Sequence, residues 1–422
     1  MEKITQEQLL EIIERHKKFL MGSGGGQRAI LTCKDLSGLD FRLADLSNAD
    51  FSGARLDGAN MSQASFVNAS FFSCDMHKTD MKNSNFTRAD FRGAEVIGSD
   101  LSEADFTHAD FRQGHLLNYK SENPDEGWGK HGHTRFSGST VRDTNLSGVM
   151  AQHANFSETN LSGVIIQNAN LSGVDLTGAN LSDTDFTGCS MARAKFEKAI
   201  VDGTNLSGVI GDISALKDMQ AEQKQRKRFD DRSAKKNIAL MVKNHSLWVA
   251  SDGGNGQQLN LSGYDLSHET HIKKYPLSII IAEDCKFAGL DLEGVSMQSS
   301  TLDKSDFRDC AAYGADFRGS SFKDALFTRA DLSHADFSAL KVEKKGKSAE
   351  YRPANLTGAR FAYANLENTN FKGADLSGAD FTRADLRGAD LTDAILTGVV
   401  FEGADLTDTK MPEMDIIESK SD

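Results

Sequence analysis

The sequence is poor in proline, in aromatic residues and in long apolar runs. Its 422 residues include four prolines and two tryptophans, and 8% of the residues are aromatic. No run of 18 apolar residues occurs, which argues against a membrane-spanning helix. The N-terminal stretch MEKITQEQLLEIIERHKKFL is charged throughout, unlike a signal peptide. We therefore expect a cytoplasmic protein whose core is narrow and built from Leu, Phe and Ala.

Acidic residues outnumber basic ones everywhere except in one central segment. The net charge is −13, with −7 over residues 1–211, +4 over 212–245 and −10 over 246–422. Because each contact with a nucleic-acid phosphate needs a cation, the acidic segments argue against direct nucleic-acid binding. The acidic segments could bind a basic surface on a partner protein, or they could simply keep the protein soluble. The basic segment is predicted to be helical, and its interleaved acidic residues favour a linker over a helix that binds nucleic acid or membrane.

The sequence is rich in a repeat of five residues. A large apolar residue recurs at every fifth position, and two positions before it stands a small residue such as Ala, Ser, Thr, Val or Cys. Five matches neither the period of a helix nor that of a flat strand. The large residues run from Leu36 to Leu116, from Phe136 to Leu206, through Leu261 and Leu266, from Phe287 to Phe337, and from Leu356 to Met411.

A turn after every five residues explains this period. Four repeats then form one square coil, with the large side chain pointing inward from each side and the small one filling space near a corner. Stacked coils satisfy their backbone groups by bonding to the coils above and below. Proline cannot donate to such a ladder, and all four prolines fall outside the repeat blocks, at positions 124, 276, 353 and 412. The pattern predicts an all-β solenoid.

The repeats resemble a known family. Ala374-Asp375-Leu376-Ser377-Gly378 matches the pentapeptide-repeat pattern A-[DN]-[LF]-x-x, and the resemblance covers about two-thirds of the chain. It implies a right-handed quadrilateral β-helix. The structural core is then expected to include Leu36, Phe41, Phe91, Phe106, Leu171, Phe307, Phe381 and Leu386.

The chain looks duplicated. A segment from His16, HKKFLMGSGGGQRAILTCKDL, and one from His245, HSLWVASDGGNGQQLNLSGYDL, share a helix, a glycine turn and a first repeat. We expect two stacked or hinged modules that meet near 211–215. The predicted segments are an N-terminal helical cap and glycine turn (1–34), a first repeat module (35–211) with a loop at 117–135, a basic linker and capping helix (212–258), a second repeat module (259–411) with loops at 267–286 and 338–355, and a flexible tail (412–422).

Catalytic and metal-binding chemistry is not evident. Four of the five cysteines occupy the small inward slot, as compact apolar residues do, and Cys33 has no evident partner. His131 and His133, like His268 and His271, lack the further ligands that a metal needs. The GSGGGQ stretch lacks the Lys-Ser/Thr of a phosphate-binding loop. We therefore predict no enzyme, no cofactor and no metal.

Two functions compete. One is a scaffold whose loops and outward faces bind a partner protein, with Trp128, beside His131 and His133, as the anchor. The other follows from the resemblance, since fluoroquinolone-resistance members of the family mimic DNA and bind DNA gyrase. An acidic column of Asp40, Asp80 and Asp100 would serve that role, although Arg42 and Lys82 flank it. We favour the scaffold. A homodimer and a secreted bacterial effector stay open.

Overall fold

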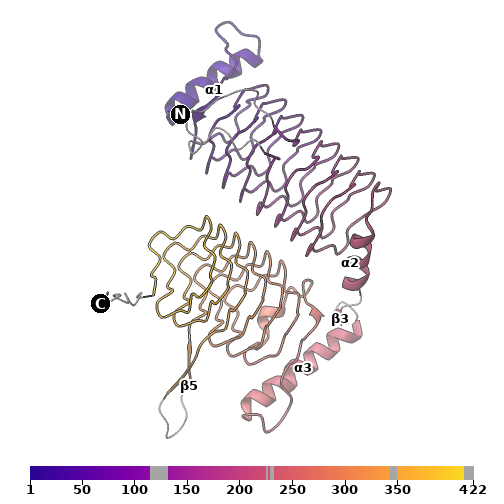
Figure 1. The fold of residues 1–422 in the computed structure, drawn as a ribbon, viewed down its shortest axis with the longest axis vertical. Coiled ribbons are helices and arrows are strands. Elements are labelled where there is room, and N and C mark those ends of the chain that lie inside the picture. Colours follow the sequence, from indigo (N-terminus) through magenta and orange to yellow (C-terminus); the bar gives the residue numbers. More distant parts are fainter. Residues whose placement is uncertain (115–131, 225–226, 229–231, 343–348, 413–422) are drawn as a thin grey trace, which may run out of the picture. The chain divides into compact units, whose positions relative to one another are not determined.

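The structure is a computed structural model that describes residues 1–114, 132–224, 227–228, 232–342 and 349–412 (Figure 1). The chain divides into two compact units, Met1–Gln225 and Arg226–Asp422. Each unit contains a solenoid of stacked coils that starts beside a helix. The two units are described separately below.

The coils are joined by parallel bridges between single residues. Within an uninterrupted block the bridged residues are twenty positions apart, as in Asp50–Ser70 and Ser70–Asp90. Phe51 donates its backbone N–H to the Ser70 carbonyl at 2.8 Å, and the N–H of Ser70 returns to Ala49 at 3.0 Å. An offset of twenty is four repeats, so each coil has four sides. This agrees with the β-helix predicted from the period of five.

The corners are β-turns whose chemistry explains the repeat pattern. In the repeat around Leu46, the backbone N–H of Ala49 bonds to the Leu46 carbonyl at 3.0 Å, and Asn48 adopts a left-handed φ of 65°. The Asp45 carboxylate accepts the backbone N–H of Ser47 at 3.1 Å. Asp and Asn are the side chains that make this local bond to the backbone two residues on. This bond explains why Asp and Asn are frequent at the position before Leu or Phe.

Stacked aromatic rings fill the interior of both units. Phe51 and Phe71 lie in successive coils with ring centroids 4.8 Å apart and planes 8° from parallel. A second column runs through Phe66, Phe86 and Phe106, at 5.0 and 4.7 Å. Burial of these rings is the main stabilising contribution of such a core. The eight residues expected in the core are all buried, namely Leu36, Phe41, Phe91, Phe106, Leu171, Phe307, Phe381 and Leu386.

Helix α1 (Gln6–Leu20) covers the start of the first solenoid. Thr5 and Gln8 form a capping box that satisfies the first backbone N–H groups of the helix. Leu9 is fully buried, and Ile12 and Ile13 pack against the solenoid core. The short strand β1 (Glu2–Lys3) pairs in parallel with β2 (Lys34–Asp35). The N-terminal segment thus covers apolar side chains of the first coil and pairs with part of its backbone edge.

A buried histidine fixes α1 to the coil. His16 accepts the backbone N–H of Ala29 at its Nδ1 (2.9 Å), so its Nε2–H donates to the Ser47 carbonyl (3.0 Å). Burial lowers the pKa of this imidazole, although the Ser47 bond opposes the shift. His16 is therefore a neutral structural link between helix, turn and coil.

Helix α3 (Arg232–Ala250) repeats this arrangement in the second unit. His245 accepts the N–H of Leu259 at 3.1 Å and bonds to the Ser278 carbonyl at 2.9 Å. Its ring stacks on Trp248, as that of His16 stacks on Phe19. Strand β3 (Lys227–Arg228) pairs in parallel with β4 (Tyr264–Asp265), matching β1 and β2. The equivalence of the two caps is thus seen in their contacts.

Glycine is required where each turn returns to its helix. A Cβ atom on Gly26 would lie 2.3 Å from the backbone nitrogen of Phe19. One on Gly256 would lie 2.1 Å from the Asn244 carbonyl oxygen. Backbone atoms cannot yield by that much, so these two positions exclude any side chain.

The boundary predicted near 211–215 is wrong, because a second cap follows the first solenoid. Helix α2 (Ser214–Lys224) belongs to the first unit, which ends at Gln225. Ile213 and Leu216 are buried in the core of that unit, and the Gln220 side chain donates to the Thr204 carbonyl at 2.7 Å. The helix therefore covers the last coil, and the predicted single helical linker is two helices.

The loop predicted at 267–286 is also too long. The coil already resumes at Leu277, and Ile281 and Lys286 bridge to Thr301 and Asp306. The sequence concealed this because Ala282 fills the slot of a large residue. The excursion itself contains the 3-10 helix η1 (Ile272–Lys274). In the segment predicted at 338–355, β5 (Leu340–Val342) and β6 (Glu350–Arg352) pair antiparallel.

Candidate binding surfaces

The predicted acidic column is a real ladder of outward residues. Parallel bridges join Asp40 to Asn60, Asn60 to Asp80, and Asp80 to Asp100. Asp40 forms an ion pair with Arg42 at 2.6 Å, and the Arg42 hydrogen bond lowers the pKa of that carboxyl. Lys82 lies 3.6 Å from the Asp80 carboxylate and 3.5 Å from that of Asp100. Three carboxylates thus face two cations.

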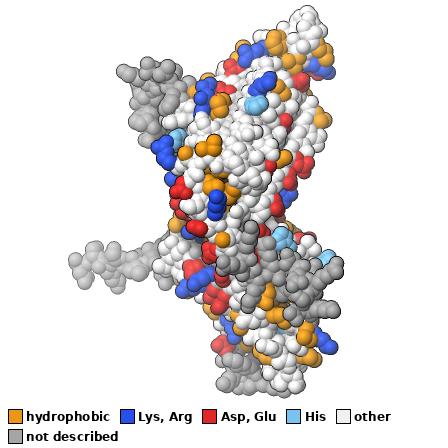
Figure 2. All heavy atoms as spheres, turned by 90° about the vertical axis from the view of Figure 1, so that its right-hand side faces the viewer, with side chains coloured by type: hydrophobic (Ala, Val, Ile, Leu, Met, Phe, Trp, Pro, Cys, Tyr) orange, Lys and Arg blue, Asp and Glu red, His pale blue; other side chains and the backbone are white. Residues whose placement is uncertain are grey.

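The resulting charge density is far below that of DNA. Four rungs at about 4.8 Å each span roughly 14 Å. Each strand of B-DNA carries one negative charge per about 3.4 Å of axis, or about four over that length, whereas this column carries a net charge of −1. Figure 2 shows acidic and basic side chains intermixed on the face that it displays. The column is therefore a weak mimic of a phosphate backbone.

A neighbouring side of the same solenoid holds a charged network that the sequence pattern did not reveal. His77 lies 3.3 Å from the Asp57 carboxylate and 3.3 Å from that of Glu95. Glu95 also pairs with Arg135, and Asp57 with Arg55. The hydrogen bonds that His77 donates to the Asp57 and Glu95 carboxylates raise its pKa to about 9. This histidine is therefore a cation at neutral pH and holds adjacent coils together.

The predicted loop anchor lies mostly outside the described residues. Trp128 and His131 are not among them. His133 is exposed, with its ring 5.5 Å from that of His153. Thr134, next to it, is buried and donates its hydroxyl to the Phe91 carbonyl at 2.9 Å. Thr134 and Arg135 already belong to the coil, so the predicted loop limit of 135 is too late.

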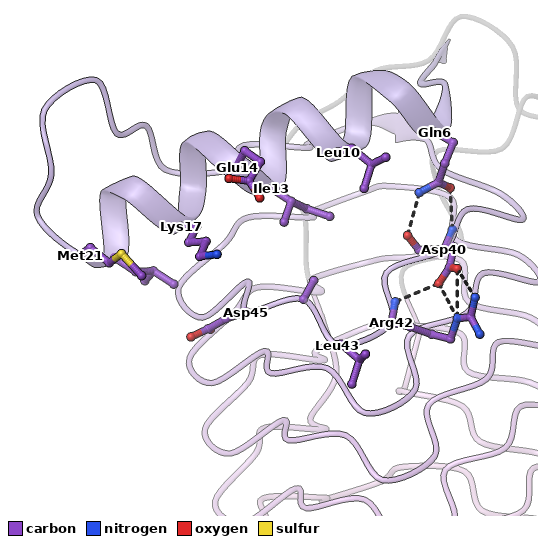
Figure 3. A pocket seen from close by; sticks show the side chains of 12 residues that line it. Gln6, Leu10, Ile13, Glu14, Lys17, Met21, Asp40, Arg42, Leu43 and Asp45 are labelled. Carbon is purple, nitrogen blue, oxygen red and sulfur yellow. Dashed lines mark hydrogen bonds and ion pairs between the residues drawn. The ribbon is translucent and has the colours of Figure 1, made fainter.

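A groove between α1 and the first coil was missed by sequence analysis. It has a volume of about 750 Å³ and is lined on the helix side by Leu10, Ile13 and Met21, and on the coil side by Leu43 and Asp45. Leu10 is 54% exposed, Leu43 74% and Met21 68%. Figure 3 shows Leu10 and Ile13 extending from the helix toward the coil. The sequence feature that could have indicated this groove is Leu43, a large apolar residue at a turn position that faces solvent.

No metal centre is evident among the cysteines and histidines that the structure describes. Cys74, Cys189, Cys285 and Cys310 are buried, and Cys33 is exposed. The Cys74 thiol donates to the Phe51 carbonyl at 2.9 Å, and burial raises the pKa of Cys189 to about 11. In the part of the chain that the structure describes, no three metal-ligating side chains gather. No helix within those ranges is long and apolar enough to cross a bilayer.

Family models match most of the solenoid. The model described as "Pentapeptide repeats" matches residues 133–168, 169–208, 305–339, 354–393 and 384–419, and the "Pentapeptide repeat region" model matches 34–120. Together they cover more than half of the chain. The chain belongs to the pentapeptide-repeat family. This membership supports the right-handed sense expected for the coils.

Several solved pentapeptide-repeat structures are similar to parts or most of this chain. The chain is 20% identical to a form of QnrB1, a plasmid-mediated fluoroquinolone resistance protein, covering 47% of this chain and 91% of that one with a TM-score of 0.34. It is 16% identical to HetL, involved in heterocyst differentiation regulation in the cyanobacterium Nostoc, covering 94% and 95% with a TM-score of 0.20. No curated protein sequence matches the chain. Because both TM-scores are low, the family assignment rests on the repeat models.

Proposed function

We propose that this pentapeptide-repeat protein is a non-enzymatic scaffold that binds a partner protein through its loops and outward surfaces. The observation that carries the proposal is the filled interior. Phe, Leu and Ala side chains occupy the inside of both solenoids, as in the Phe51–Phe71 stack. Only outward side chains, loops and end caps then remain for recognition. Repeat solenoids commonly use such extended surfaces for binding.

The outward carboxylates add little to this recognition on their own. Asp45, Asp50 and Asp100 each accept a backbone N–H two residues on, so they are engaged in turns. Many others are paired with arginine, as Asp90 is with Arg92 at 2.7 Å. Charges on the rim of an interface mainly change the association rate, whereas buried aromatic anchors carry affinity. The proposal therefore assigns affinity to Trp128, with His131 and His133 beside it.

A second candidate is a DNA-mimicking modulator of DNA gyrase. The regular ladder through Asp40, Asp80 and Asp100 favours it, since the carboxylates lie on one side of successive coils. Resistance proteins of the family, which the repeats resemble, act in this way. The pairing with Arg42 and Lys82 opposes it.

Affinity capture with full-length protein separates the two candidates. Extracts of the source cells would be quantified by mass spectrometry and probed for both gyrase subunits. We expect Trp128→Ala and deletion of 118–131, which leaves the buried coil residue Thr134 in place, to abolish capture of the partner. The triple variant Asp40→Asn, Asp80→Asn, Asp100→Asn serves as the matched control and should retain it. Loss in the triple variant alone would instead support the DNA mimic.

A further inference from the structure

The first coil of the solenoid exposes a backbone edge. In later coils each bridging residue bonds to the coil before it: Asp50 donates its N–H to Ala29 at 3.1 Å, and its carbonyl accepts from Leu31 at 2.7 Å. The first coil has no predecessor. Its four bridging residues, Ile30, Asp35, Asp40 and Asp45, therefore direct these groups toward the cap.

The N-terminal segment satisfies two of these four sides. Strand β1 pairs with Asp35, and the following N–H of Ile4 bonds to the Asp35 carbonyl at 3.0 Å. On the next side, the Gln6 side-chain amide replaces a strand. Its Nε2 donates to the Asp40 carbonyl and its Oε1 accepts the Asp40 N–H, both at 2.9 Å (Figure 3).

The side of the first coil at Asp45 has an unpaired backbone edge, and this edge lies within the groove. Neither the backbone N–H nor the carbonyl of Asp45 has a hydrogen-bond partner among the described residues. It lies in the wall of the groove together with Leu10, Ile13 and Leu43. An unpaired strand edge is a template for addition of another strand. A strand edge beside an apolar groove is the combination that β-strand addition of peptides uses.

The second unit blocks the equivalent edge. His16 bonds to the Ser47 carbonyl and His245 to the Ser278 carbonyl, so Ser47 corresponds to Ser278 and Asp45 to Pro276. Proline has no N–H to donate and is a common means of closing a strand edge. The backbone edge at Ile30 differs in this respect, because its equivalent in the second unit is Asn260, which has a backbone N–H, and not a proline. Of the two solenoid starts, which α1 and α3 cover, the first thus combines an open edge at this position with the groove between α1 and the first coil.

The charges around the groove favour a basic guest. Among the described residues, Glu14 and Asp45 have no ion-pair partner, whereas Arg42 is already engaged by Asp40. Lys17 is the one cation in the groove wall that no carboxylate pairs with in the described structure. Two carboxylates that lack an ion-pair partner among the described residues therefore face one ammonium group, which leaves a net negative site.

We propose that the Asp45 edge binds an extended segment of a partner protein that carries a basic residue next to a large apolar one. The segment adds in parallel, as β1 does. Its backbone bonds to the N–H and carbonyl of Asp45, and its apolar side chain enters the groove between Leu10, Ile13 and Leu43. The N-terminal segment of the chain itself shows this pattern on the neighbouring side of the coil. There the basic residue Lys3 precedes Ile4, whose apolar side chain is buried beside Asp35. This inference rests on the proposed scaffold function and adds a specific peptide site to it.

The test is selection of peptides on the full-length protein. A random nine-residue library displayed on phage is selected against the wild type and, in parallel, against Asp45→Pro, which reproduces the residue of the second unit. We expect wild-type selection to enrich peptides with Lys or Arg next to Leu, Ile, Val or Phe. Absence of enrichment, or equal enrichment on Asp45→Pro with an unchanged melting temperature, would overturn the proposal.

The best peptide, labelled with a fluorophore, then separates backbone pairing from charge. N-methylation of its central amide should weaken binding roughly three- to tenfold, the effect of one lost hydrogen bond. Asp45→Asn keeps the N–H and the turn, so it should bind nearly as well but with less salt dependence. Unchanged affinity of the N-methylated peptide would refute strand addition even if Asp45→Pro were poorly folded. Failure of both tests with intact partner capture would leave the scaffold function standing.

Discussion

Replacement of Phe71 and of Phe72 by alanine should have very different effects on stability, although the two residues are adjacent. Phe71 is fully buried and stacks on Phe51 at 4.8 Å and on Phe91 at 4.9 Å. Its ring also contacts Phe66 and Phe86 edge to face, at 5.5 and 5.6 Å. Phe72 faces outward and is partly exposed, with the Arg92 guanidinium 5.5 Å from its ring.

The expected magnitudes follow from these contacts. A buried Phe→Ala change costs about 3–5 kcal/mol. Phe71→Ala should fall near 4 kcal/mol, because backbone bonds such as Phe71 N–H to the Asp90 carbonyl (2.7 Å) hold the coils apart and prevent collapse of the cavity. Phe72→Ala loses part of a surface contact and a cation–π interaction, which together are worth about 0.5–1 kcal/mol. A whole domain is stable by about 5–15 kcal/mol.

Urea unfolding followed by hydrogen exchange measures both effects in the full-length protein. Peptides from residues 1–225 report on the first unit and peptides from 232–422 serve as an internal control. We expect Phe71→Ala to lower the urea midpoint of the first unit strongly and Phe72→Ala to lower it slightly. Equal shifts for the two variants would refute the assignment of inward and outward positions.

Three further predictions concern the first unit. Phe91→Asp should abolish its folding, because an unpaired buried carboxylate costs several kcal/mol; an unchanged circular dichroism melt would contradict this. Residues 1–225 should be soluble and folded alone, whereas 1–211 should aggregate without α2; equal solubility would show that α2 is no cap. The pKa of His77 is raised to about 9 in the folded state, from about 6.5 in the unfolded state. The ion pairs of His77 should therefore stabilise the first unit fully below pH 6.5, and this contribution should be lost as the pH rises through 9. His77→Gln should remove about 1 kcal/mol near pH 6 and nothing above pH 10, discounting for partial exposure; a constant difference across this range would exclude the ion pairs as its cause.

The coil could be predicted well from the sequence because each side of the coil is determined by the five residues of its own repeat. Each side of the coil has room for one large side chain in its interior, which explains why a large residue recurs at every fifth position. Phe91 and Leu386 are buried there as expected. The turn position after the large residue also carries a signal, since the left-handed φ at Asn48 suits Asn and Gly. The same logic failed at Ala282, where a small residue fills a large slot.

The candidate sites were harder to predict because they depend on contacts between distant residues. Gln6 gave no sign that its amide would replace a strand at Asp40, thirty-four positions away. Asp45 looks like any other turn residue, and only the absence of a preceding coil makes its backbone available. The partial neutralisation of the acidic column by Lys82 was visible in part, since Lys82 lies two positions after Asp80 in the repeat, but its ion pair with Asp100 was not.

The central claim, a protein-binding scaffold rather than a mimic of DNA, is tested most directly by gyrase supercoiling assays with purified full-length protein. The account predicts no inhibition at physiological salt, because the Asp40, Asp80 and Asp100 column is largely neutralised by Arg42 and Lys82. Inhibition by the intact protein that is lost in the Asp40→Asn, Asp80→Asn, Asp100→Asn variant, and retained after deletion of 118–131, would contradict it.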